Sequence, residues 1–364
     1  MVKARMVALG ITASVLGIFM AGMAALGGAQ AGSSSAVGTE SGERTIEDGG
    51  TGPYKAIAVG NSSISTHTIY RPKDLSAFGD REKLPILAWG NGGCANSNSG
   101  HQNYLSEIAS HGYLIVAIGP MQAGGGRGGP RAGGPAAGAP AAGAPAGAPV
   151  PSGGTLLDAV NWATAQNANP QSPYYRKIDT SKVAVFGHSC GGLQALEVSP
   201  DPRVKTTLVV DSGILNSPGA APGAAATPRG AAGPGGAAGG APAGAGRGGA
   251  GGGNLPGMPP LTKEHLAKLH APVFYLLGGE SDIAYANGMD DFKRIEKLPV
   301  FVANKGVGHG GTFTQPHGGD WAMASVAWLQ WQFRGDAEAG KLFTGNPPGL
   351  AMKDGWTVDK KNIP

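Results

Sequence analysis

Short apolar runs alternate with helical patterns along most of this chain, and this alternation restricts the folds open to it. Runs such as 84–89 and 273–277 are almost entirely apolar, as in strands buried on both faces of a parallel sheet. Strands are predicted at 54–59, 67–71, 84–89, 113–118, 182–186, 204–210, 273–277 and 300–303, the first two antiparallel. Helices are predicted at 103–111, 155–166, 191–198, 262–270, 291–295 and 321–333. We therefore expect an α/β fold with a mostly parallel, doubly wound sheet that binds ligands beyond the carboxyl ends of its strands.

Two tracts of almost pure Gly, Ala and Pro interrupt this pattern, at 123–154 and 218–253. Such segments bury too little apolar surface to offset the entropy lost on ordering, so we expect both to be disordered insertions. Collagen is excluded because Gly does not recur at every third position. Without these tracts and the N-terminal leader, about 265 residues remain, which suits one α/β domain.

The N-terminal residues predict export from the cytoplasm. Lys3 and Arg5 precede an uncharged run rich in Ala, Gly, Leu and Met, and 29–31 read Ala-Gln-Ala, a pattern that signal peptidases accept. We expect residues 1–31 to be a cleaved signal peptide; the alternative is a retained membrane anchor. A flexible segment at 32–53 and a single domain at 54–364 follow.

Charge and cysteine content narrow the classes of partner. The formal net charge is +4, and removal of Lys3 and Arg5 leaves about +2. This balance does not favour nucleic acid as a partner, and signal cleavage would leave no stable insertion in a membrane. Two cysteines, Cys94 and Cys190, permit a single disulfide in an exported protein.

The strongest motif begins directly after the predicted strand 182–186. Residues 187–191 read Gly-His-Ser-Cys-Gly, which matches the G-x-S-x-G nucleophile elbow. Small residues at Gly187 and Gly191 allow a sharp strand-to-helix turn that exposes the hydroxyl of Ser189. The helix dipole at this turn favours negative charge that develops during a reaction. Ser189 is therefore the candidate nucleophile, and the alternative is an ordinary Gly-Ser turn.

A serine hydroxyl needs a base, and His309 is the candidate. It lies in a glycine-rich loop between the last predicted strand and the closing helix, so the loop can return it over the strand ends. His317, eight residues later in the same loop, is the rival. We expect His188 to point away from the nucleophile, and His101 and His111 to be structural.

Asp282 is the candidate acid that orients the base. It follows the predicted strand 273–277 and lies between Ser189 and His309 in the sequence. Asp211, after the preceding strand, is the main rival, and Glu280 is a weaker one. The resulting order Ser, Asp, His is the one that G-x-S-x-G hydrolases use.

Backbone amides complete the predicted catalytic set. The N–H of Cys190, directly after the nucleophile, is one expected oxyanion donor, and the N–H of Gly93 in the glycine loop 91–94 is the other. The alternatives are a neighbouring amide of this loop as the second donor, or a simple glycine turn. Two donors aimed at one oxygen bring these backbones close together. Cys94 then comes within disulfide range of Cys190, so we predict a Cys94–Cys190 bond; the alternative is two separate buried thiols.

These residues carry a family resemblance. Across roughly 54–335, with the turn at 187–191, the loop at 90–93, Asp282 and His309, the chain resembles the α/β-hydrolase superfamily. Once the tract is removed, the short spacing from Ser189 to Asp282 is similar to the secreted arm that holds cutinase-like polyesterases, chlorophyllases and platelet-activating-factor acetylhydrolases. The resemblance implies no metal and no cofactor. The chain departs from the polyesterases at Cys190, and it has Asn-Gly at 91–92 where many relatives carry His-Gly.

The expected function is hydrolysis of a small or polymeric carboxylic ester by a secreted or periplasmic protein. Trp89, Tyr285, Trp321 and Phe313 lie near the predicted strand ends and are candidates to line the substrate site, with core packing as the alternative. A serine peptidase on the same fold usually carries a propeller or a helical cap, and this chain has no stretch for either. A dehalogenase would have Asp in place of Ser189. A non-catalytic cell-envelope-binding protein would not require a Ser, Asp and His set.

Overall fold

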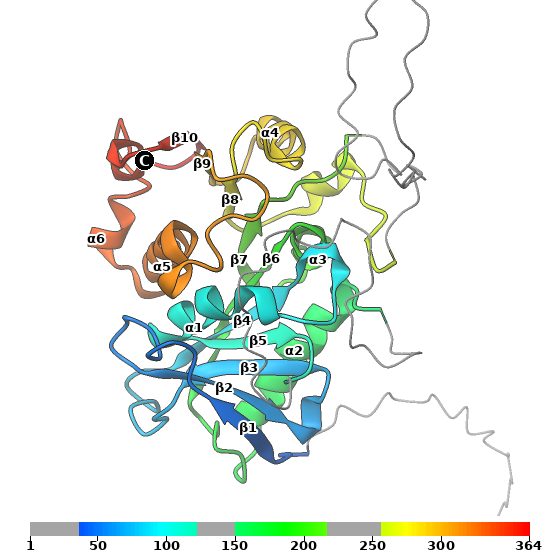
Figure 1. Cartoon of the computed structure of the whole chain (residues 1–364), viewed down its shortest axis with the longest axis vertical. Helices are drawn as coiled ribbons and strands as arrows, with labels where there is room; N and C mark the ends of the chain where they lie inside the picture. The colour runs from blue at the N-terminus through cyan, green and yellow to red at the C-terminus, as the bar shows by residue number, and fades with distance from the viewer. Residues whose placement is uncertain (1–35, 122–149, 217–255) are drawn as a thin grey trace, which may run out of the picture. The chain divides into compact units, whose positions relative to one another are not determined.

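A computed structural model describes residues 36–121, 150–216 and 256–364 (Figure 1). The predicted signal peptide, and nearly all of both Gly/Ala/Pro tracts, lie outside these residues. The first tract was predicted to extend to residue 154, but helix α2 already begins at Gly153. Its start is held by a capping box in which Ser152 and Thr155 bond each other's backbone.

Ten strands of the described residues form one sheet in the order β1-β2-β3-β5-β4-β6-β7-β8-β9-β10. The strands are β1 (Glu40–Arg44), β2 (Ala56–Asn61), β3 (His67–Pro72), β4 (Leu84–Gly90), β5 (Leu114–Ile118), β6 (Ile178–His188), β7 (Val204–Val210), β8 (Val273–Leu277), β9 (Val300–Lys305) and β10 (Trp356–Lys361). The six strands from β5 to β9 in this order are parallel, and the outer strands on both sides pair antiparallel. The mostly parallel α/β sheet and the antiparallel β2–β3 pair confirm the prediction.

Helices cover both faces of the sheet (Figure 1). They are α1 (Gln102–Ser110), α2 (Gly153–Ala168), α3 (Cys190–Val198), α4 (Tyr285–Arg294), α5 (Gly319–Arg334) and the short α6 (Ala337–Gly340). Short 3-10 turns are η1 (Ser62–Ile64), η2 (Gly92–Cys94), η3 (Ser99–His101), η4 (Lys263–Lys268), η5 (Pro316–Gly318) and η6 (Gly349–Met352).

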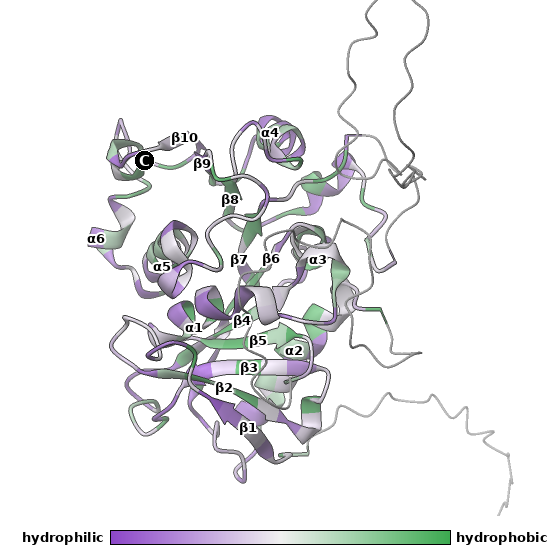
Figure 2. Ribbon diagram, viewed as in Figure 1, coloured by the Kyte–Doolittle hydropathy of each residue, from purple (hydrophilic) through white to green (hydrophobic). Residues whose placement is uncertain are grey.

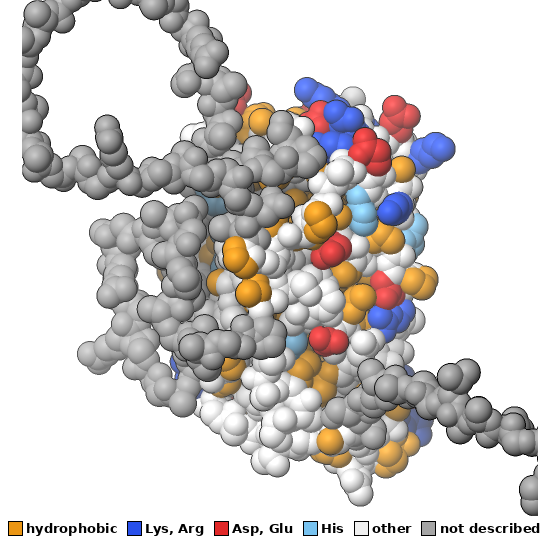
Figure 3. Space-filling view, turned by 90° about the vertical axis from the view of Figure 1, so that its right-hand side faces the viewer, with side chains coloured by type: hydrophobic (Ala, Val, Ile, Leu, Met, Phe, Trp, Pro, Cys, Tyr) orange, Lys and Arg blue, Asp and Glu red, His pale blue; other side chains and the backbone are white. Residues whose placement is uncertain are grey.

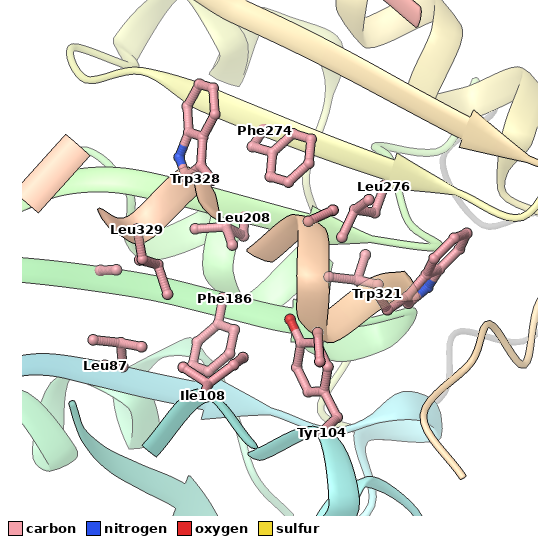
Figure 4. Close-up of a cluster of buried hydrophobic side chains, with 14 of the residues drawn as sticks. Leu87, Tyr104, Ile108, Phe186, Leu208, Phe274, Leu276, Trp321, Trp328 and Leu329 are labelled. Carbon is pink, nitrogen blue, oxygen red and sulfur yellow. The ribbon is translucent and has the colours of Figure 1, made fainter. Parts of the chain in front are cut away.

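Alternate residues of each central strand face opposite layers, because side chains point to opposite sides of a pleated strand. On β4, Leu87 packs beneath α1 and α5, whereas Ile86 and Ala88 pack against α2. The layer beneath α1 and α5 is rich in aromatic rings (Figure 4). Strands β5 and β8 are hydrophobic along their length because both faces are buried (Figure 2).

Three elements differ from the sequence-based expectations. The segment 32–53 was assigned as flexible, but Glu40–Arg44 forms edge strand β1, where Arg71 and the Tyr174 hydroxyl both bind the Glu40 carboxylate. The predicted helix at 262–270 is the shorter 3-10 turn η4. Strand β10 was not predicted, since its sequence is mostly polar and it pairs only with β9 at the edge.

Candidate active site

Three loops at the carboxyl ends of β6, β8 and β9 bring Ser189, Asp282 and His309 into one hydrogen-bonded row. The Nε2 atom of His309 lies 2.9 Å from the Oγ atom of Ser189. The Nδ1 atom of His309 lies 2.6 Å from Oδ1 of Asp282. Since a carboxylate only accepts, Nδ1 donates to Asp282 and Nε2 is left to accept the proton of the Ser189 hydroxyl.

The backbone at Ser189 is held in a turn that few residues adopt. Ser189 has φ 54° and ψ −116°, and it is the N-cap of α3. The turn requires glycine on both sides: a Cβ on Gly187 would lie 2.4 Å from the Gly191 backbone, and one on Gly191 would lie 2.1 Å from the backbone of Gly90. A positive φ at a serine persists only where the surrounding structure enforces it. Gly187 and Gly191 allow the close backbone packing that holds Ser189 in this conformation.

Direct backbone contact between two loops places His309 beside Asp282. The N–H of Gly308 donates to the carbonyl of Gly278 at 2.6 Å. A Cβ on Gly278 would lie 2.1 Å from the Gly308 oxygen, so only glycine fits there. Gly308 has φ +75°, in the left-handed region that glycine adopts freely. The loop after β9 is thereby seated against the loop after β8.

The Asp282 carboxylate is fully buried and well satisfied. Besides His309 Nδ1, it accepts the N–H of Ala284 at 2.9 Å and the N–H of Gly278 at 3.1 Å. Burial alone would raise its pKa, but the hydrogen bonds from His309 and Ala284 oppose burial and hold the pKa of Asp282 below its usual value. Asp282 is therefore a carboxylate at neutral pH, suited to stabilise a positive imidazolium.

A disulfide joins Cys94, in the glycine loop after β4, to Cys190, the residue after Ser189. Their Cα atoms are 5.2 Å apart, and the bond confirms the prediction. In the described part of the chain, the N–H groups of Gly93 and Cys190 donate no hydrogen bond. A side chain built on Gly93 would meet no atom within 4 Å, so its backbone borders open space. Two free N–H donors thus lie on backbones that the disulfide holds together.

The disulfide leads to a prediction on stability and turnover. It closes a loop with a sequence separation of 96, for which the chain-entropy model gives about 4 to 5 kcal/mol of stabilisation. We expect the Cys94→Ala/Cys190→Ala double variant to have a lower melting temperature and, in an esterase assay, a lower kcat with a smaller change in KM. Thiol titration of the denatured, unreduced wild type is expected to find no free thiol. Unchanged melting and turnover in the double variant would contradict this role.

The rival residues lie elsewhere or behind the row. The Nδ1 atom of His317 is 3.5 to 3.7 Å from carboxylate oxygens of Glu47, Asp48 and Glu107, away from Ser189. Glu280 is exposed. Asp211 is fully buried, and its Oδ2 accepts the indole N–H of Trp321 at 3.3 Å. Burial and the neighbouring charge of Asp282 raise the pKa of Asp211 well above its usual value, which favours the neutral acid.

This difference between the two acids predicts that substitution by an amide strongly lowers kcat at Asp282 and changes it little at Asp211. Asp282→Asn is expected to lower kcat on the order of 10⁴-fold, because the amide no longer favours the Nδ1–H tautomer of His309 or its charged form. Asp211→Asn is expected to change kcat by only a few-fold, because an amide mimics a neutral acid and still accepts from Trp321. Each variant serves as the other's control in steady-state ester hydrolysis. A larger loss for Asp211→Asn would reverse the assignment.

Three of the four proposed substrate contacts are core residues. Trp89 and Trp321 have 0% exposed surface, and Phe313 has 3%. Trp89 packs between Phe186 and His101, and its indole N–H donates to Asn91 at 2.8 Å. These rings support the loops from beneath and offer no surface to a ligand in this conformation. Trp321 lies in the layer of α5 beside the sheet (Figure 4).

Apolar surface above the strand ends comes from other residues. Tyr285 is half-buried at the start of α4, and Ile283, next to Asp282, is 38% exposed. Sequence reasoning did not single out Ile283, although its place directly after the acid was a usable signal. On the face shown in Figure 3, the visible hydrophobic side chains stand among polar and charged ones rather than in one continuous patch.

His188 and His101 have contacts that the sequence did not reveal. His188 was expected to point away from the nucleophile. Its Nε2 atom lies 2.8 Å from the backbone oxygen of His309. Its Nδ1 atom lies 3.3 Å from Nε2 of His101. His101, expected to be structural, therefore packs behind the loop that carries His309. The position of His188 within the G-x-S-x-G motif was the only available sequence signal.

Within the three described ranges, no group of three or more His, Cys, Asp or Glu side chains is arranged to hold a metal ion. None of the helices in those ranges is both long and apolar enough to span a bilayer. The chain matches no protein-family model, and no curated protein is significantly similar to it in sequence.

Proposed function

We propose that this protein is a serine hydrolase of the α/β-hydrolase superfamily that cleaves carboxylic esters. The observation that carries the proposal is the row Ser189 Oγ, His309 Nε2 and Nδ1, and Asp282 Oδ1, with contacts of 2.9 and 2.6 Å. Its members occur in the order Ser, Asp, His along the chain, each after a different strand of a mostly parallel sheet. This arrangement of nucleophile, base and orienting acid is the one that acyl transfer requires.

The geometry supports a two-step reaction. The Ser189 Oγ attacks the ester carbonyl while His309 Nε2 takes the hydroxyl proton, and the resulting oxyanion accepts the N–H groups of Gly93 and Cys190. The C–O bond to the alcohol then breaks, His309 returns the proton to the leaving alcohol, and the acyl group stays on Ser189. Water, deprotonated by His309, next attacks the acyl-enzyme carbonyl. The bond between the acyl carbon and Ser189 Oγ then breaks, His309 returns the proton to Oγ, and the acid leaves. Asp282 stabilises the imidazolium formed in both steps.

The substrate in this proposal is a small or polymeric ester with apolar character beside the carbonyl. Support comes from Ile283 and Tyr285, which give the loop after β8 an apolar surface next to Asp282. The open space over Gly93 supports access from solvent to the oxyanion donors. We place the protein outside the cytoplasm because a disulfide persists in oxidising compartments.

The test is a pre-steady-state assay with 4-nitrophenyl acetate and butyrate. We expect a burst of nitrophenol close to one equivalent per chain, and intact-mass spectrometry of quenched protein is expected to show the acyl mass on the peptide that contains Ser189. Ser189→Ala should give neither signal. Cleavage of peptides without ester hydrolysis would support a serine peptidase instead. Failure of a fluorophosphonate to label Ser189 would support a non-catalytic binding protein.

A further inference from the structure

His188 forms a bridge between the backbone of His309 and a second buried histidine. Its Nε2 atom is 2.8 Å from the carbonyl oxygen of His309, and its Nδ1 atom is 3.3 Å from Nε2 of His101. The rings of His188 and His309 have centroids 5.1 Å apart, and those of His188 and His101 are 5.2 Å apart. His188 directly precedes Ser189, so one segment carries the hydroxyl and also contacts the loop of its partner.

For two neutral rings, the donors and acceptors in this bridge allow only one assignment of protons. A carbonyl oxygen can only accept, so Nε2 of His188 carries a hydrogen. In a neutral ring, Nδ1 of His188 is then an acceptor, and Nε2 of His101 must carry the hydrogen that it accepts. The Nδ1 atom of His101 then carries no hydrogen, and it is buried without a hydrogen-bond partner among the described residues. In their neutral forms, both rings are therefore Nε2–H tautomers.

Packing prevents the pair from relaxing. A Cβ on Gly92 would lie 2.6 Å from Nδ1 of His188, so the glycine loop lies directly against the ring. Phe313 meets His188 and His101 edge-on, with centroids 4.9 and 4.7 Å away, and Trp89 packs against His101. A ring enclosed in this way cannot rotate without opening the loop that carries His309.

We infer that His188 and His101 are positioning residues that hold the backbone of His309 where its imidazole can hydrogen-bond to Ser189. The inference rests on the proposed function, since it concerns the base of that reaction. In the described structure, the end of β6 and the loop after β9 are joined here by His188 Nε2–H donating to the His309 carbonyl. A shift of the base by about 1 Å costs on the order of 100-fold in rate, so this bond acts on kcat.

The neutral state of the pair has a consequence for acid stability. Burial and the nearby His309 lower the pKa of His188 to about 4, and burial lowers that of His101 well below its usual value. Asp211 and Asp282 are the acids that face His188, and Oδ2 of Asp211 is 3.9 Å from its Nε2 atom. In the unfolded chain these histidines bind protons near pH 6.5, whereas folded His188 binds its proton only near pH 4. The contribution of these histidines to folding stability is therefore fully present above about pH 6.5, and it is lost as the pH falls toward 4.

The test compares two substitutions of His188 that differ in one hydrogen bond. His188→Gln places an amide N–H near the Nε2 position and is expected to keep kcat for 4-nitrophenyl butyrate within about three-fold of wild type. His188→Leu keeps apolar bulk without the donor and is expected to lower kcat about 100-fold with little change in KM. Equal losses in both variants, or equal retention, would overturn the positioning role. His188→Gln is also expected to lose less stability than wild type between pH 6.5 and 4.

A measurement on the wild-type protein remains decisive if a variant fails to fold. Nitrogen-15 NMR of labelled histidines is expected to show the Nε2–H tautomer for His188 and His101, with neither ring protonated at pH 5. An Nδ1–H tautomer at His188, or its titration near pH 6.5, would overturn the inference. If wild type hydrolyses no ester, the proposed function fails. The NMR measurement of the two tautomers then still tests whether the histidine pair holds the loop that carries His309.

Discussion

Ser189→Ala is expected to reduce kcat for a short 4-nitrophenyl ester on the order of 10⁴- to 10⁶-fold while leaving the fold intact. Ser189 supplies the oxygen 2.9 Å from His309 Nε2, and alanine at this position cannot form an acyl-enzyme. The Ser189 backbone bonds that seat the turn remain, since its N–H donates to Val210 and its carbonyl accepts the hydroxyl of Ser212.

The measurement needs two readouts. Steady-state kinetics gives the loss of turnover, and thermal unfolding followed by circular dichroism checks the fold. The melting temperature is expected to stay nearly unchanged, because alanine must adopt the same positive φ as Ser189 and the backbone bonds of the turn remain. Ser181→Ala is a control that removes an exposed hydroxyl of β6 bonded to Asp179, and it is expected to retain the turnover of wild type. Residual activity of Ser189→Ala above about one per cent, free of contaminating enzyme, would refute Ser189 as the nucleophile.

His309→Ala is expected to lower kcat by a similar factor, whereas His317→Ala is expected to keep it within a few-fold. The physical reason is the identity of the base: among the histidines that the structure describes, only His309 contacts both Ser189 and Asp282. His317 instead lies among Glu47, Asp48 and Glu107. Removal of His317 leaves those three carboxylates without the nearby imidazole, so its effect should appear in thermal stability rather than in turnover.

The paired histidine variants also separate base catalysis from structural support. Added imidazole is expected to restore part of the activity of His309→Ala, because a small base can enter the space that the side chain leaves. It is expected to have no effect on His317→Ala. Strong loss of turnover in His317→Ala with a normal melting temperature would transfer the role of base to His317.

Much of the architecture followed from local patterns. The apolar runs predicted the central strands because strands buried on both faces must be continuously apolar, and β4, β5, β7 and β8 lie where the runs are. The edges were harder to predict. Strand β1 depends on Arg71 and Tyr174 binding Glu40, and β10 depends on pairing with β9, so neither leaves a hydrophobic signal in the sequence.

The sequence could not show which aromatic side chains near the site are exposed to a substrate. Trp89 and Trp321 were placed near the strand ends correctly, but exposure depends on which side of a loop packs against the core. In the structure both indoles are fully buried, and their N–H groups bond Asn91 and Asp211. The sequence therefore identified large rings near the site without determining whether they face a ligand or the core.

The sequence by itself determined which chemical groups are available: a serine in a glycine-bounded turn, acids and histidines after later strands, and two cysteines. It did not determine which of them meet. His309 and His317 lie in one loop, and Asp211 and Asp282 each follow a strand. Only tertiary structure decided that His309 contacts Asp282, because the contact depends on the Gly278–Gly308 backbone bond and on the positive φ of Gly308. Hydrogen bonds form over about 3 Å, and the relative placement of two loops at that scale is set by long-range packing rather than by neighbours in sequence.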